Sequence, residues 1–146
     1  MKILIPTDGS ESASRALETA IGFARTLDAE LVVCHVVDIA QAAVMSGGQA
    51  QLVDGCLDVL QTDGARILDE AVARASRDVR TSSLSANGDP VEEIERLAGD
   101  VQPAFIVIGT HGRSGLARAL MGSVAEGVVR RAAVPVMVVP AHHLSS

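Results

Sequence analysis

The sequence predicts an α/β fold: a single domain built on an open parallel sheet of five strands, with helices on both faces. Short apolar runs alternate with longer segments in which apolar residues recur every three or four positions, the pattern of strands alternating with helices. The chain has 146 residues, of which 48% are hydrophobic, enough for one core in one domain. Polar or glycine-rich turn clusters follow several of the apolar runs, as expected where strands lead into helices.

The first part of the chain is predicted to form two strands around one helix. Lys2 to Pro6 is a short apolar run that ends at the turn cluster Thr7-Asp8-Gly9-Ser10. A helix is predicted from Ser12, because the apolar residues from Ala13 to Leu27 follow helical spacing. Leu31 to Val37 is continuous and rich in valine, as in a central parallel strand that is covered on both faces.

The middle of the chain has a weaker pattern. Residues from Ile39 to Ala50 are small, uncharged and without clear periodicity, so a mobile loop that could act as a lid is expected there. Helical spacing returns from Gln51 to Ala75 and predicts a long or interrupted helix, since Gly55 and Gly64 each weaken a helix by about 1 kcal/mol. Val79 to Ala86 alternates in a polar pattern that suits an edge strand.

The last third of the chain completes the alternation of strands and helices. The turn Asn87-Gly88-Asp89-Pro90 precedes a helix that runs to about Gly99. Ala104 to Ile108 is predicted as a fourth strand, Ser123 to Ala132 as a fourth helix and Val134 to Val139 as a fifth strand. If the strand order is 3-2-1-4-5, the winding direction reverses between the first and fourth strands, where such sheets bind ligands.

Composition argues against several classes of protein. The formal net charge of -6 repels nucleic acid phosphates, and two Phe without Tyr or Trp give bases almost nothing to stack on, so no nucleic acid partner is expected. Cys34 and Cys56 form no metal-type pair and indicate thiols in a reducing compartment. The first apolar stretch is broken by Pro6 and Asp8, far short of a signal peptide or a membrane span. We expect a cytoplasmic protein.

The most informative segment is residues 109–123, which we call the glycine arm. It reads Gly109-Thr110-His111-Gly112, then nine residues, then Gly122-Ser123, and it joins a predicted strand to a predicted helix. Glycines let backbone N–H groups approach an anion, and a helix N-terminus adds its positive end. The arm carries Arg113, Arg118 and His111 but no carboxylate, so it is locally positive. This placement favours phosphate binding over a solvated turn, although the arm matches neither a Walker A loop nor a GxGxxG fingerprint.

Several side chains in these segments have two interpretations that the sequence leaves open. Ser123 could donate its hydroxyl to a phosphate or could cap the helix that follows. Asp8 and Thr7 could contact a ribose or a phosphate-bound metal, or could cap the first helix. Arg113 could pair with a phosphate or be solvated. His35 lies inside the second strand and is more typical of a core imidazole than of a catalytic base.

A nucleotide base would also need an apolar slot. With two Phe and no Tyr or Trp in the chain, the available walls are Pro6, Val36 and Val37, whose main-chain groups could bind the edge of an adenine. The sequence contains no nucleophile paired with a base and no His, Cys and carboxylate set at metal-ligand spacing. We therefore predict no catalytic residue and no metal site formed by the protein itself.

Three segments closely resemble the universal stress protein family. They are the glycine arm, Lys2 to Ser10 and Val134 to Pro140, and the likeness spans nearly the whole chain. The arm matches the glycine spacing, with a final Ser or Thr, that marks the ATP-binding branch of this family. The resemblance implies a five-stranded parallel sheet of order 3-2-1-4-5 and ATP as ligand, with Mg or Mn held by its phosphates.

The resemblance also implies where the ligand and a second subunit lie. Asp8 would lie near the nucleotide, Val37 near adenine and Gly88 at a neighbouring loop. The candidate nucleotide-binding residues are Pro6, Thr7, Asp8, Val37, Gly109, Gly112, Arg113, Gly122, Ser123 and Val124. A homodimer joined through the fifth strand, Val134 to Val139, is implied as well, and this strand is apolar enough to make an unpaired edge costly.

Three functions are compatible with these features. The first is an ATP-binding stress regulator that changes shape or protein partner with nucleotide. The second is a slow ATPase or phosphotransferase, and the third is a nucleotide-free dimeric scaffold. We favour the first, because the residues of an enzyme are missing whereas the spacing of the arm is intact. The sequence does not identify the regulatory partner.

Overall fold

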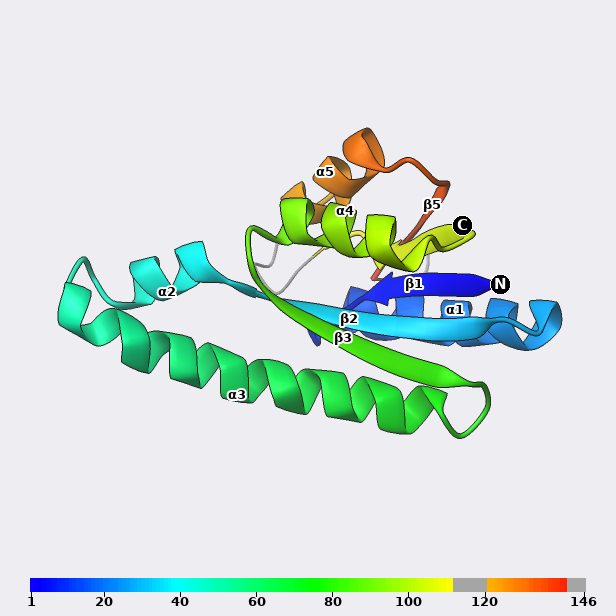
Figure 1. Cartoon of the computed structure of the whole chain (residues 1–146), viewed down its shortest axis with the longest axis horizontal. Coiled ribbons are helices and arrows are strands. Elements are labelled where there is room, and N and C mark those ends of the chain that lie inside the picture. The colour runs from blue at the N-terminus through cyan, green and yellow to red at the C-terminus, as the bar shows by residue number, and fades with distance from the viewer. Residues whose placement is uncertain (112–120, 142–146) are drawn as a thin grey trace.

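The computed structural model describes residues 1–111 and 121–141, and five strands within them form one parallel sheet in the order β3-β2-β1-β4-β5 (Figure 1). The predicted α/β class and strand order are therefore confirmed. The strands are β1 (Lys2–Pro6), β2 (Glu30–Asp38), β3 (Thr81–Gly88), β4 (Phe105–Gly109) and β5 (Val136–Val139). The helices are α1 (Glu11–Leu27), α2 (Ile39–Met45), α3 (Ala50–Ala75), α4 (Pro90–Val101) and α5 (Ser123–Arg131).

The core consists of two apolar layers, one on each face of the sheet. On β1, Ile3 and Ile5 belong to the layer that packs against α1 and α3, whereas Leu4 belongs to the layer under α4 and α5. All three side chains are fully buried, because successive side chains of a strand point to opposite faces and both faces are covered here (Figure 1). This double coverage explains why the runs that form β1, β2 and β4 are mostly apolar in the sequence.

The predicted loop from Ile39 to Ala50 is wrong over its first part. Residues Ile39–Met45 form α2, and the carboxylate of Asp38 caps this helix by accepting from the N–H of Ala40 at 3.0 Å. The segment is rich in alanine, which favours helix, but its seven residues are too few to establish a period. The described part of the chain therefore has one helix more than the four predicted, while the other bounds differ from the predicted ones by at most about two residues.

Helix α3 is continuous over 26 residues, so the long form of the predicted helix is the one that occurs. Its second half packs on the sheet through Ile67, Leu68, Ala71 and Ala75. Its first turns extend past the sheet, next to α2 (Figure 1). None of the described helices is both long enough and apolar enough to cross a membrane.

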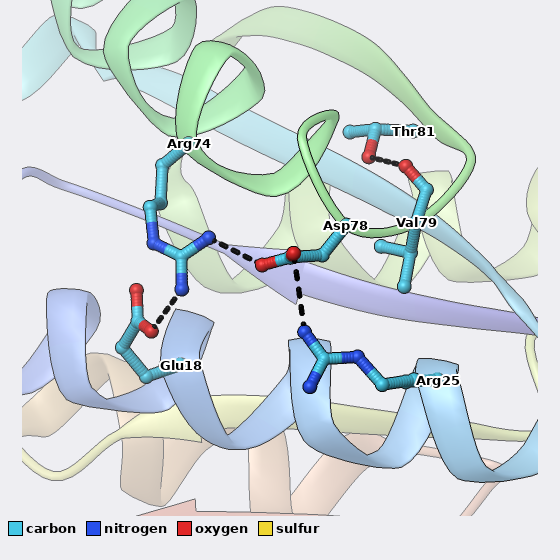
Figure 2. A network of polar contacts seen from close by, with 6 residues as sticks. All are labelled: Glu18, Arg25, Arg74, Asp78, Val79 and Thr81. Atoms are coloured by element: carbon cyan, nitrogen blue, oxygen red, sulfur yellow. Dashed lines mark hydrogen bonds and ion pairs between the residues drawn. The ribbon is translucent and has the colours of Figure 1, made fainter.

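Exposed ion pairs connect the end of α3 to α1. Arg74 lies 2.6 Å from a carboxylate oxygen of Glu18 on α1 and 2.7 Å from one of Asp78, and Asp78 also lies 3.2 Å from Arg25 (Figure 2). The hydrogen bond from Arg74 lowers the pKa of Asp78 below its ordinary value. These pairs join the turn after α3 to α1, but exposed pairs of this kind contribute little stability.

The two cysteines are both free thiols. Cys34 on β2 is fully buried, and burial raises the pKa of its thiol to about 12. Cys56 lies on the first half of α3 and is half-buried. The expected absence of a disulfide between them agrees with this placement, and the protonated Cys34 thiol behaves as a small apolar core residue.

Gly64 marks a close approach between α3 and β2. A Cβ at this position would lie 2.6 Å from Cδ2 of His35, and the ring is held in place by a 2.7 Å hydrogen bond from Nδ1 to the carbonyl oxygen of Thr7. We expect Gly64→Ala to lower the free energy of unfolding by about 1–3 kcal/mol, as overpacking does, in spite of the better helix propensity of alanine. Urea unfolding followed by circular dichroism measures this change.

Gly55→Ala on the same helix is the matched control. Nothing lies within 4 Å of a Cβ added at Gly55, so the substitution is expected to stabilise the protein by up to about 1 kcal/mol. Effects of the same sign and size at Gly55 and Gly64 would contradict the close packing of α3 on His35.

Candidate functional site

Two loops meet at the carboxyl edge of the sheet, between its first and fourth strands. β1 and β4 are parallel neighbours, with Ile3 opposite Phe105 and Leu4 opposite Ile106. The chain leaves β1 through Thr7-Asp8-Gly9-Ser10, and it leaves β4 at the start of the glycine arm. The strand order reverses between these two strands, which is where open parallel sheets bind their ligands.

Serines at the start of α1 hold the glycine arm in place. The hydroxyl of Ser10 donates to the carbonyl oxygen of His111 at 3.3 Å, and the hydroxyl of Ser12 makes a shorter hydrogen bond to the same oxygen. The N–H of His111 lies 3.3 Å from Oγ of Ser12. Ser12 is only 1% exposed, and a buried hydroxyl requires such partners. The sequence did not predict that Ser10 and Ser12 contact the glycine arm, although a serine within the apolar face of a helix, such as Ser12, is a usable signal.

Gly109 is explained by packing against α1. A Cβ at this position would lie 2.6 Å from the carbonyl carbon of Ser12 and 2.8 Å from its oxygen. The missing side chain therefore lets the end of β4 approach the first turn of α1. From the sequence, Gly109 is expected to let an anion approach the main chain. The structure adds a second role, close packing of β4 against α1, which involves no ligand.

The loop after β1 is held by its own side chains and by β2. Oγ1 of Thr7 accepts from the N–H of Gly9 at 3.2 Å, and the N–H of Thr7 donates to the carbonyl oxygen of Cys34 at 2.8 Å. Asp8 accepts from the N–H of Ser10 at 2.9 Å. Ser10, not Asp8 or Thr7, caps α1, so the capping alternative for these two residues is wrong. The N-cap is the last residue before the helical backbone begins, here Ser10. The composition of the turn cluster alone did not distinguish Ser10 from Thr7 and Asp8.

His35 has a structural role in the same region. Its Nδ1 lies 2.7 Å from the carbonyl oxygen of Thr7, and its ring packs against α3 at Gly64. This agrees with the expected hydrogen-bonded imidazole, although the residue is half-buried and lies near the site.

Helix α5 begins beside the end of β4, and its N-cap residue has no side chain with which to cap it. Gly122 is its N-cap residue, and the N–H of Gly122 donates to the carbonyl oxygen of Thr110. Ser123 is the first helical residue, so the alternative in which Ser123 caps the helix is wrong. The first N–H groups of a helix have no acceptor within it, and they carry the positive end of the helix dipole. Those of Ser123 and Val124 therefore suit an anion.

The predicted walls of an adenine slot do not share one face of the sheet. Val37 faces α3, since one of its methyl groups lies 3.6 Å from a Cβ built at Gly64. Val36 packs in the opposite layer, and Pro6 points to that same side because it alternates with Ile5. Side-chain packing alone therefore does not bring Pro6, Val36 and Val37 to one face, and an adenine slot formed by their main-chain groups stays a prediction. Gly112, Arg113 and Arg118 lie outside the described residues.

Two hollows lie on the described surface. A cleft of about 210 Å³ between α1 and α3 starts at Thr7 and Gly9, and its walls include Arg66 and Arg74. Both arginines are already paired with carboxylates at 2.6 Å. A groove of about 480 Å³ between α4 and α5 reaches Ile106 on β4. Among residues 1–111 and 121–141, no group of three or more His, Cys, Asp or Glu side chains is placed to hold a metal ion.

Comparison with known proteins decides the family. The family model described as the universal stress protein family matches residues 1–140. The chain belongs to the universal stress protein family. The resemblance that the glycine arm and the two ends of the chain indicated is thus confirmed.

Relatives of this universal stress protein match it over most of their length. Universal stress protein MJ0531 of Methanocaldococcus jannaschii is 36% identical over 140 residues, which cover 94% of this chain and 81% of that protein. Universal stress protein YxiE of Bacillus subtilis is 31% identical over 147 residues, which cover 94% of this chain and 97% of that protein.

Solved structures confirm the universal stress protein fold. The structure of MJ0577 from Methanocaldococcus jannaschii has a TM-score of 0.83 and 29% identity, with 94% of each chain covered. A universal stress protein crystallised in complex with cAMP has a TM-score of 0.69 and 27% identity, with 97% of this chain and 98% of that chain covered.

The packing of Gly109 on α1 predicts a loss of stability that does not depend on any ligand. A Cβ would meet the main chain of Ser12, which cannot move aside as the tip of a side chain can. We expect Gly109→Ala to lower the free energy of unfolding of the nucleotide-free protein by about 1–3 kcal/mol, measured in urea.

Gly99→Ala on α4 serves as the control for Gly109→Ala, because a Cβ at Gly99 meets nothing within 4 Å. This control is expected to leave stability unchanged or slightly raised. If Gly109→Ala unfolded at the same urea concentration as the wild type, the contact between α1 and β4 would not be as close as described.

Proposed function

We propose that this universal stress protein binds ATP where the loop after β1 meets the glycine arm, and that it acts as a nucleotide-dependent regulator in the stress response. One observation carries the proposal: the N-terminus of α5, where no described side chain caps the helix, is held next to the end of β4 by the hydrogen bond from Gly122 to Thr110. A relative 27% identical to this chain was crystallised with cAMP, which supports an adenine nucleotide as the class of ligand.

In the proposed complex, each part of the nucleotide has its own partners. The phosphates accept hydrogen bonds from the N–H groups of Ser123 and Val124 and from the Ser123 hydroxyl. Gly112 and Arg113 complete the phosphate site from the rest of the glycine arm. Asp8 contacts the ribose, and adenine lies near the main chain of Val37 at the end of β2.

Mg or Mn enters this complex bound to the phosphates of ATP. The described residues offer no cluster of metal ligands, so the protein is proposed to bind the metal only through the nucleotide. No catalytic residue is proposed, and turnover is at most slow. Repeated turnovers that are lost in a Ser123→Ala, Gly122→Ala double variant would instead identify an ATPase or phosphotransferase.

We further propose that two copies pair through their β5 strands in the cytoplasm. The carbonyl oxygens of Pro135 and Val139 accept from β4, so the main-chain groups of Val136 and Val138 point to the open edge of the sheet. This edge is apolar, whereas the opposite edge, β3, exposes Ser82, Ser83 and Ser85. An apolar edge without a partner favours pairing with another strand.

Binding of ATP predicts a stabilised protein and a specific effect of one main-chain amide. Mg-ATP at about 100 times its dissociation constant should stabilise the fold by about 2.7 kcal/mol, measured as a raised melting temperature. Ser123→Pro removes the N–H of the first helical residue, and a hydrogen bond to a charged group is worth about 1.5–3 kcal/mol. We expect this variant to bind Mg-ATP at least about tenfold more weakly than Ser123→Ala does.

The comparison with Ser123→Ala isolates the amide, because both variants lack the hydroxyl. Proline is favoured at the first position of a helix, and Gly122 has φ -64° and ψ 158°, which suits a residue before proline. Both variants should therefore fold as the wild type does. Equal affinities of the two variants would rule out the α5 N-terminus as the phosphate site, and an unchanged melting temperature of the wild type would favour the scaffold.

The proposed dimer predicts that a proline at the open edge of β5 yields a monomer. Val138→Pro removes an N–H that points away from β4, a position where edge strands tolerate proline. Val138→Thr keeps that N–H and is the control. Light scattering after size exclusion should give a dimer mass for the wild type and for Val138→Thr and a monomer mass for Val138→Pro. A dimeric Val138→Pro protein would place the interface elsewhere.

A further inference from the structure

His111 stands where the glycine arm leaves the sheet, and its main chain is fixed from α1. Its carbonyl oxygen accepts from the hydroxyls of Ser10 and Ser12, and its N–H lies 3.3 Å from Oγ of Ser12. Ser12 is itself buried against the end of β4. The backbone from which the imidazole projects is therefore held in one position before any ligand binds.

The two ring nitrogens of His111 have different surroundings. Nδ1 lies 3.1 Å from Oγ1 of Thr110, within hydrogen-bond distance. Nε2 is buried and has no hydrogen-bond partner, and among residues 1–111 and 121–141 it is the one buried side-chain nitrogen or oxygen in that state. Buried polar atoms of native proteins are paired with few exceptions, so an orphaned nitrogen points to a partner that lies outside residues 1–111 and 121–141.

The partner can be identified by the chemistry around the residue. Thr110, next to His111 in the chain, accepts from the N–H of Gly122 at the start of α5. The first N–H groups of α5 have no side-chain cap and are hydrogen-bond donors with a partial positive charge. A ligand held there is an anion with several acceptor oxygens, which is the chemistry of a phosphate.

The ring can present a donor to such a ligand. Nε2 carries a proton in the neutral tautomer whose Nδ1 accepts from the Thr110 hydroxyl, and also in the imidazolium. In both states the contact with Thr110 is kept.

We propose that His111 binds ATP directly, with Nε2–H donating a hydrogen bond to a phosphate oxygen. The inference rests on the proposed binding of ATP and adds a side chain that selects nucleotides by their phosphates. Because adenosine lacks the acceptor, His111 contributes to the affinity for ATP and not to that for adenosine. The serines of α1 act as positioning residues for this side chain.

Two substitutions separate the ring nitrogens. The side-chain amide of His111→Asn reaches the position of Nδ1 and can still contact Thr110, but it has no group at the position of Nε2. The longer side chain of His111→Gln places its amide N–H₂ near the position of Nε2. By isothermal titration calorimetry with Mg-ATP, we expect the dissociation constant of His111→Asn to rise about tenfold or more, and that of His111→Gln to stay within a few-fold of the wild type.

The same titrations with adenosine test whether the effect comes from the phosphate. Adenosine affinity should be equal in the wild type and in both variants. A His111→Asn protein that binds Mg-ATP as the wild type does would overturn the inference, as would an equal loss of affinity for ATP and adenosine. A wild-type protein that binds no Mg-ATP would overturn both the proposed function and this inference.

A measurement on the wild type keeps the test independent of how the variants fold. In protein labelled with ¹⁵N-histidine, the Nε2 resonance of His111, assigned by its loss in His111→Gln, should shift on saturation with Mg-ATP and stay in place with adenosine. A resonance that does not move while Mg-ATP binds would overturn the role of His111 and leave the binding of ATP intact.

Discussion

The contact between the first turn of α1 and the end of β4 determines the geometry of the candidate site. Because Gly109 has no Cβ, the main chain of Ser12 lies against it, and from there the hydroxyls of Ser10 and Ser12 reach the carbonyl of His111. The loop after β1 and the start of the glycine arm are thereby joined before any ligand binds. This preorganisation needs a residue without a side chain at the end of β4, and small hydroxyl side chains opposite it at the start of α1.

The helix N-termini of the molecule are capped in two different ways, and the difference has a bearing on function. Ser10, Asp38 and Asp89 cap α1, α2 and α4 with their side chains. Neither α3 nor α5 has such a cap, but α3 begins beyond the sheet, next to α2, whereas α5 begins at the strand ends. Of these two helices, α5 is therefore the one whose N-terminus is suited to an anion, because it begins where the winding direction of the sheet reverses.

The fold was predictable from the sequence because burial determines the pattern of each long element. Strands β1, β2 and β4 are covered on both faces and the inner faces of α1 and α4 are apolar at helical spacing, so the apolar pattern alone located them. The short helix α2 could not show a period. The cap of α1, the packing role of Gly109 and the opposite faces of Pro6 and Val37 depend on turn geometry and strand register, which one sequence does not contain.

The two edges of the sheet differ, and the difference bears on how far the proposed pairing of copies could extend. One outer strand, β3, exposes serines, and the other, β5, is apolar. Two molecules joined through β5 would leave only serine-bearing strands at both ends of the combined sheet, and hydrated hydroxyls give an incoming strand little to gain. Addition of further molecules to the sheet would therefore stop at the dimer. An open sheet with one apolar edge strand need not form a fibre.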